Sequence, residues 1–459
     1  MDVNTTTDRT SRQRALLFWC LLLAGGLYFI WRGPWRAMEI SVDLPTFYSA
    51  ARAWLHGLDP YNVAELVRVY AEAGGDEQTV LMNVNPPFQF PLFAWLGALP
   101  YPVVKLLFVA INMAALGLAV WRLAVVSGVW ARPAMQRWLV LGVLVMAPVH
   151  TTISQGQLSL LVLLLVVLML EAHHRGREGW MGLWLALAGA LKPQMVVLFG
   201  LYYLFSGRWR ACIVAAGVGL ALTGLAVVRM ELADVDWLAG WRGNMVMFLH
   251  AEPAEHPGVG YGDYTVDSLR RFIMINLAPL IYPLLSSRTA VTMLTGMLGL
   301  TAVVLAASMA RRDGDAVGSR LAQYAMISVA CLLVFYNRTY SATLLLLPFV
   351  AVLLWWPMHR RLAVTCLACL SVFVVPGPAI LLRWMAGRAE DVADSLAWWW
   401  PVVLPHQIYA LLLLLGLMAL AWRWPPRRLG SDVMPLPAQN GLPARQSATV
   451  VSVDGGKAK

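Results

Sequence analysis

The sequence has little charge and very little lysine. Only 13% of its 459 residues are charged and four are lysine, whereas 59% are hydrophobic. Its apolar runs repeatedly reach the roughly 20 residues that a helix needs to cross a bilayer. The composition therefore argues against a water-soluble enzyme and predicts an all-α polytopic membrane protein.

Cysteine is also scarce, and its distribution argues against a metal centre. The five cysteines all lie in apolar runs, and the pair Cys366 and Cys369 shares a helix face without histidine nearby. We expect small buried side chains here, neither disulfides nor metal ligands. No glycine-rich phosphate loop or Ser-His-Asp arrangement occurs in a supporting context. The prediction is an active site with no metal and no cofactor, so that any activating group arrives with the substrate.

The net charge of +10 could indicate nucleic-acid binding, but the positions of the arginines favour another explanation. They cluster in the first tail and in short links between apolar runs, such as Arg175 to Arg177 and Arg208 to Arg210. The positive-inside rule places such links in the cytoplasm. We therefore predict no nucleic-acid partner and assign the links at 132–137, 175–177, 208–210, 311–320, 360–361 and 423–428 to the cytoplasmic side.

The remaining connections should then face outward. The two longest, residues 32–101 and 231–286, each carry seven acidic residues against four and three arginines. The run 179–206 begins and ends beside cytoplasmic arginines and is broken at Lys192-Pro193, which predicts a helical hairpin. Counting its two arms gives about twelve spans, with a cytoplasmic tail at 1–14, a membrane domain at 15–424 and a disordered cytoplasmic tail at 425–459.

The first outer loop, 32–101, should contain two helices that lie in the membrane interface. The first has apolar residues at helical spacing, with Arg52 and His56 facing away, and the second begins after the prolines near Asn85. The apolar face of the first comprises Phe47, Ala50, Ala51, Trp54 and Leu55.

Asp43 stands at the N-terminal edge of the first of these helices and is the main catalytic candidate. A carboxylate beside the bilayer can accept a proton from an incoming hydroxyl group, as a general base does. Aspartate is equally a favoured N-cap, and Pro45 suits a first helical turn. From the spacing alone, both interpretations stay open.

Two cationic side chains could hold a phosphate. Lys192 lies between two apolar arms, where a lysine needs a partner such as an anionic phosphate. The alternative is a lysine that reaches the interface and has no ligand. Arg338 belongs to a polar link on the same predicted side as Asp43 and could clamp a phosphate with two hydrogen bonds.

Further polar residues near these positions are candidate substrate contacts. For Asp59, a turn residue before proline is the simpler explanation, and for His150 and Gln157 it is a solvated outer link. The predicted substrate-binding residues are Tyr48, Arg52, Asp59, Tyr61, Asn85, His150, Gln157, Tyr336, Asn337 and Tyr340.

The order of these segments resembles the polyprenol-phosphate-dependent glycosyltransferases of family 87, in the GT-C superfamily. The resemblance rests on four features of the first half of the chain. They are Asp43 to Tyr61 with its Gly-x-Asp-Pro-Tyr element, Asn85-Pro86-Pro87 to Pro100, Gly156-Gln157, and Ala190-Leu191-Lys192-Pro193.

The resemblance implies a GT-C-like helical bundle and a specific reaction. A hexose, often mannose, would move with inversion from a polyprenyl phosphate to an acceptor hydroxyl on a glycan or glycolipid. The reaction would occur at the extracytoplasmic face of a membrane, for which a bacterial plasma membrane is expected, and Asp43 would match the catalytic base of the first outer loop.

The competing hypothesis is a polytopic transporter of a small or lipid-linked solute. Transporters often contain paired repeats and polar residues near the membrane midplane. This sequence has no convincing repeat between its halves, and its ionisable residues concentrate at the outer edges of the spans. The pattern favours the enzyme.

Overall fold

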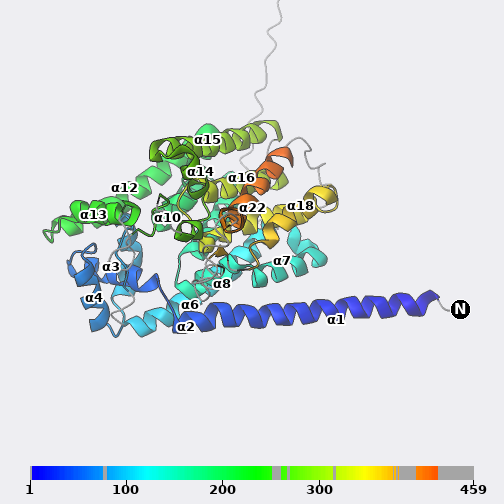
Figure 1. Ribbon diagram of the computed structural model, residues 1–459, viewed down its shortest axis with the longest axis horizontal. Coiled ribbons are helices and arrows are strands. Elements are labelled where there is room, and N and C mark those ends of the chain that lie inside the picture. The colour runs from blue at the N-terminus through cyan, green and yellow to red at the C-terminus, as the bar shows by residue number, and fades with distance from the viewer. Residues whose placement is uncertain are drawn as a thin grey trace, which may run out of the picture. The chain divides into compact units, whose positions relative to one another are not determined.

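The computed structural model in Figure 1 consists of helices and connecting loops. It describes residues 3–75, 80–250, 260–265, 269–313, 317–375, 377–378, 381 and 400–421. Within these ranges the only strand-like pairing is an isolated antiparallel bridge between Met274 and Arg338. The predicted all-α class is confirmed for this part of the chain, whereas the predicted tail at 425–459 lies outside it.

Within the described residues, four helices are long and apolar enough to cross a membrane, and a bent pair could form a fifth span. The bent pair is α7 (Pro133–Val145) with α8 (Ala147–Gln155), which meet at 46°. These helices make the protein an integral membrane protein. The first of the four long helices is α1 (Val3–Ile30), which continues through a π-helical turn at Trp31–Trp35 into α2 (Arg36–Glu39). The other three are α6 (Tyr101–Val126), α12 (Trp209–Glu231) and α15 (Arg288–Asp313).

Shorter apolar helices occupy the interior of the molecule. The helix α9 (Ser159–His174) and the helix α16 (Val317–Val334) are buried over most of their length. They coincide with predicted spans, although the count of twelve remains a prediction. The other short helices are α17 (Leu346–Trp355), which follows a 3₁₀ segment at Thr339–Leu345, α18 (Arg360–Ser371), α21 (Trp400–Val403) and α22 (His406–Ala421).

The predicted hairpin at 179–206 is present as two helices that meet at a break. The first is α10 (Glu178–Leu191) and the second is α11 (Val197–Phe205), joined by a 3₁₀ turn at Pro193–Met195. The break falls at Lys192 because the next residue is proline, which has no backbone N–H to continue the helix. Helix α10 packs between α9 and α12, and α11 packs on α15.

The first outer loop folds into helices that pack on one another. They are α3 (Leu44–His56), α4 (Val63–Glu72) and α5 (Phe90–Gly97), and α3 contacts both of the others. Residues 44–51 are all buried, so α3 is covered by protein on more than the single face expected of an interfacial helix. Arg52 does not face away from the fold, since its guanidinium donates to the Gly97 carbonyl at 2.8 Å. The placement of these helices at the membrane interface remains a prediction.

The described residues of the second long outer loop form three further helical segments. They are α13 (Trp237–His250), a 3₁₀ segment at Leu269–Ile273 and α14 (Ala278–Leu285). Helix α13 is joined to the first outer loop because Asn244 donates to the carbonyls of Tyr61 and Asn83, each at 2.9 Å. The two loops therefore fold together on the same side of the protein as Asp43.

Candidate active site

Asp43 occupies the N-cap position of α3, but its side chain makes no capping hydrogen bond. Its backbone N–H donates to the Gln155 carbonyl at 3.0 Å, which ties the start of α3 to the end of α8. The carboxyl group interacts with the side chain of Gln157. The geometry thus leaves the carboxyl group directed toward other polar side chains and not toward the first turn of its own helix.

Gly156 brings these two segments close together. Its φ of +66° lies in the left-handed region, and a Cβ atom there would stand 2.5 Å from both the Leu44 Cβ and the Ser41 Oγ. A side chain at this position would be strained by its backbone and would also collide with the start of α3. Glycine therefore allows the turn between α8 and α9 to place Gln157 beside Asp43.

Lys192 is buried at the break between α10 and α11. Its Nζ donates to the Ser159 Oγ at 3.0 Å and lies 4.4 Å from the centre of the Tyr340 ring. No carboxylate forms an ion pair with it among the described residues, although Asp43 is close enough for electrostatic attraction. A buried ammonium group with one hydroxyl and one ring as neighbours has two donor positions left for an anion.

Arg338 precedes the 3₁₀ segment at 339–345 and lies close to two aromatic rings. Its guanidinium carbon lies 4.8 Å from the centre of the Tyr261 ring and 5.9 Å from that of Tyr336. It also donates to the Tyr261 carbonyl at 3.4 Å, and its Nε is buried without a hydrogen-bond partner. Stacking of this kind fixes the plane of the guanidinium and leaves donor groups for a bidentate ligand.

The electrostatics of Asp43 join these groups into one site. Loss of hydration on burial raises the pKa of Asp43 above its ordinary value, while Gln157, Lys192 and Arg338 act in the opposite direction. Burial dominates, so the carboxyl group is a stronger base than a solvated aspartate. We call the set consisting of Asp43, Gln157, Lys192, Tyr336, Arg338 and Tyr340 the Asp43 cluster.

Other predicted site residues contribute to the packing of the first outer loop. The Tyr48 hydroxyl donates to the Leu99 carbonyl at 2.6 Å. The Asp59 carboxylate accepts from the Tyr61 N–H at 2.8 Å, as in a common turn, and the Tyr61 hydroxyl donates to the Asn85 carbonyl at 2.9 Å. These contacts, like that of Arg52, are with the protein itself, and a role in substrate binding remains a prediction.

His150 and Asn337 are also buried, in different surroundings. His150 lies within α8, not in a link, and its ring meets that of Tyr28 edge-on at 5.2 Å. The Asn337 amide donates to the carbonyls of Cys331 and Phe335, where it closes the end of α16. In the described part of the chain, the contacts of these side chains do not include Asp43 or Lys192, so the structure does not bring them into the Asp43 cluster.

Ser159 and Tyr261 were not among the residues singled out from the sequence. Ser159 accepts the hydrogen bond of Lys192. In the sequence, its polar neighbours at the start of an apolar run were a signal that could have identified it as a site residue. Tyr261 lies in a long loop, and nothing in the sequence connects it with Arg338. In the described residues, no group of three or more His, Cys, Asp and Glu side chains could hold a metal ion.

Comparison with known proteins gives the family. Residues 83–336, more than half of the chain, match glycosyltransferase family 87. The chain belongs to this family. It is therefore a membrane glycosyltransferase, and the transporter alternative is set aside. Searches of curated proteins and of solved structures gave no match. The matched segment of the glycosyltransferase includes Gln157 and Lys192, begins after Asp43 and ends two residues before Arg338.

Proposed function

We propose that the glycosyltransferase moves a hexose, most simply mannose, from a polyprenyl phosphate to an acceptor hydroxyl with inversion at the sugar. The acceptor would be a glycan or glycolipid, and the reaction would occur at the extracytoplasmic face of a bacterial plasma membrane. The observation that carries this proposal is the Asp43 cluster, in which a carboxyl group of raised pKa shares its surroundings with two cations.

The proposed reaction assigns separate tasks to these groups. Asp43 removes the proton of the acceptor hydroxyl as its oxygen attacks the anomeric carbon. The bond between that carbon and the phosphate oxygen breaks, and both of its electrons leave with the phosphate. Lys192 and Arg338 stabilise the negative charge that develops there, which is the usual role of fixed cations beside a leaving group.

The structure supports this division of labour in two ways. Lys192 is held by a hydroxyl and a ring at a helix break, so its position is defined before any ligand binds. The guanidinium of Arg338 likewise has fixed neighbours, since it lies over the Tyr261 ring and close to the Tyr336 ring. Preorganised cations avoid the cost of rearrangement during the reaction. The scheme uses only protein side chains and the lipid-linked donor, so it calls for no cofactor.

The experiment is a transfer assay with the full chain in lipid nanodiscs. Radiolabelled polyprenyl-phosphate mannose and glucose are offered with a panel of glycan acceptors, with nucleotide sugars as the alternative donors. We expect product only from the polyprenyl-phosphate donors, with a product linkage of inverted configuration by NMR. Transfer from a nucleotide sugar, or retention of configuration, would overturn the proposal.

A further inference from the structure

A polar cavity of about 100 Å³ lies at the other end of the helices that carry the Asp43 cluster. It is lined by His173 of α9, Tyr202 and Ser206 at the end of α11, Arg311 of α15, and residues near the start of α16. Along α9, His173 is 14 residues from Ser159, or roughly 21 Å at the rise of an α-helix. The cavity is therefore separate from the site that contains Lys192.

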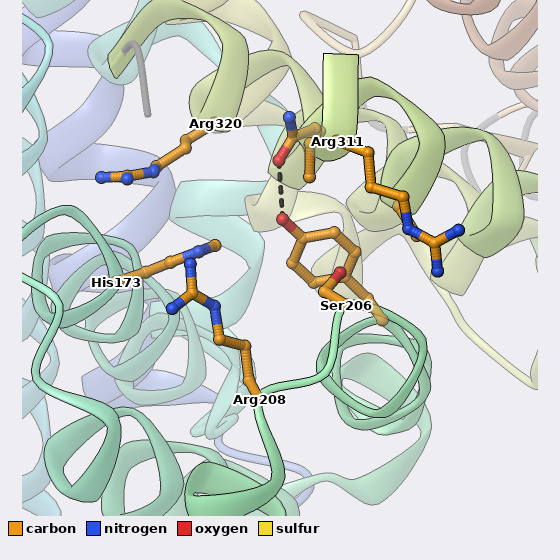
Figure 2. A pocket seen from close by; sticks show the side chains of 9 residues that line it. His173, Ser206, Arg208, Arg311 and Arg320 are labelled. Atoms are coloured by element: carbon orange, nitrogen blue, oxygen red, sulfur yellow. Dashed lines mark hydrogen bonds between the residues drawn. The ribbon is translucent and has the colours of Figure 1, made fainter. Parts of the chain in front are cut away.

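The lining of the cavity is strongly cationic. Among the residues that the structure describes, three arginines line it, namely Arg208, Arg311 and Arg320, and no carboxylate does. Arg208 forms an ion pair with Glu178 at 3.2 Å, Arg311 donates to the Phe205 carbonyl at 3.1 Å, and a guanidinium nitrogen of Arg320 lies 3.1 Å from the His174 Nδ1. Figure 2 shows Arg208 extending toward His173, whereas the guanidinium groups of Arg320 and Arg311 lie at opposite sides of the view. An anion inside the cavity would be attracted by the positive charges of the arginine side chains around it.

The cavity also offers neutral hydrogen-bonding groups and enough room. The Ser206 Oγ is buried without a hydrogen-bond partner. Hydrogen bonds fix two of the lining side chains. The Tyr202 hydroxyl donates to the Gln323 Oε1 at 2.6 Å, and the Gln323 amide donates to the Ser319 Oγ at 3.0 Å. One water molecule needs roughly 10–15 Å³ of such volume, so a group of five heavy atoms can enter.

We propose that this cavity binds a phosphate group, at the side of the membrane opposite the Asp43 cluster. Planar guanidinium groups recognise phosphate oxygens through paired hydrogen bonds, and a serine hydroxyl adds a further donor. The phosphate could belong to a lipid headgroup or be free in solution. The inference does not depend on the sugar donor or on the catalytic role of Asp43.

The test measures binding to the purified full chain by native mass spectrometry, with inorganic phosphate in one arm and phosphatidylglycerol in the other. Arg208→Gln and Arg311→Gln are compared with Arg312→Gln, which removes the same charge from the adjacent exposed residue outside the cavity. We expect the dissociation constant to rise about tenfold in the first two variants, the loss of one charge-assisted hydrogen bond, and to stay within about twofold in the third.

The two arms identify the source of the phosphate. Inorganic phosphate that displaces the lipid indicates an ion from solution, whereas lipid binding that phosphate does not disturb indicates a headgroup. Ser206→Ala keeps every charge and every ion pair, and a threefold weakening would support the site even if an arginine variant fails to fold. Equal binding in all four variants, or no binding of either ligand by the parent protein, would overturn the proposal.

Discussion

Replacing Asp43 by asparagine distinguishes a role as catalytic base from a role as helix cap, because asparagine can cap a helix but cannot accept the proton. Asp43→Asn should fold, bind the donor lipid and lose turnover by about 100-fold or more, the usual contribution of a general base. Turnover is measured with the labelled donor, and folding is measured by thermal unfolding in the same detergent.

The matched control is Asp236→Asn. Asp236 is an exposed carboxylate whose Oδ1 accepts from the Ala239 N–H at the start of α13, an interaction that asparagine can keep. This variant should retain near-parental transfer. A folded Asp43→Asn protein that is as active as the Asp236→Asn protein would exclude Asp43 as the base.

The pH dependence of transfer should reflect the raised pKa of Asp43. The base acts only when ionised, so the rate rises with pH until the pKa is passed. Because burial raises that pKa, the acidic limb of kcat/KM should lie above the range of an ordinary carboxyl group. Gln157 lowers the pKa, and Gln157→Leu should therefore shift the limb to still higher pH. A limb that stays in place, or moves to lower pH, would contradict the contact between the two side chains.

Lys192 can be tested against another lysine of the same chain. Lys192→Ala should weaken donor binding about tenfold and reduce turnover, because a charge-assisted hydrogen bond to phosphate is lost. Lys105→Ala is the control, since the Lys105 Nζ donates to the Met38 carbonyl and lies outside the Asp43 cluster. Donor affinity is measured by titration with the labelled lipid. If both variants bind the donor equally well, Lys192 holds no phosphate.

At the scale of structural elements, the turn between α8 and α9 decides whether the site forms. Gly156 and Gly176 have nearly the same φ, +66° and +65°, but only at Gly156 would an added Cβ meet other atoms. Gly176→Ala should cost the roughly 1–2 kcal/mol of a left-handed residue with a side chain. Gly156→Ala adds the collision with Leu44, worth about 1–3 kcal/mol more.

Gly156→Ala should therefore lower both the unfolding temperature and the transfer rate, because it moves Gln157 away from Asp43. Gly176→Ala should lower the unfolding temperature less and leave the rate unchanged. Thermal unfolding and the transfer assay on the same preparations measure the two effects. Equal losses in both variants would mean that close packing at Gly156 does not position the site.

The sequence predicted some of these elements from local chemistry alone. The break at Lys192 follows from the proline after it, and α3 follows from its apolar spacing. The contacts of Arg52 with Gly97 and of Arg338 with Tyr261 depend on how distant segments pack, and spacing along a chain carries no information on that. The absence of a capping bond at Asp43 is equally a result of tertiary packing, because aspartate followed by Leu-Pro is a normal helix start.

At the scale of the whole molecule, hydropathy predicted the helical class and the positions of the long spans. It also gave about twelve crossings, and that number remains a prediction, because interior helices such as α9 are shorter than the helices that can cross a membrane by length and composition alone and are buried in the protein. For the same reason the cavity between α9, α11, α15 and α16 has no sequence signature: its arginines come from links that the positive-inside rule already explains.

The membrane topology is the remaining expectation at this scale, and every role proposed for Asp43 depends on it. In a cysteine-free background, His56→Cys reports on the first outer loop and Arg177→Cys on the link between α9 and α10, and both side chains are exposed. A membrane-impermeant maleimide should label residue 56 in intact cells and residue 177 only after permeabilisation. Labelling of both after permeabilisation controls for access to the reagent. The reverse pattern would put Asp43 on the cytoplasmic side, where an acceptor at the extracytoplasmic face could not reach it.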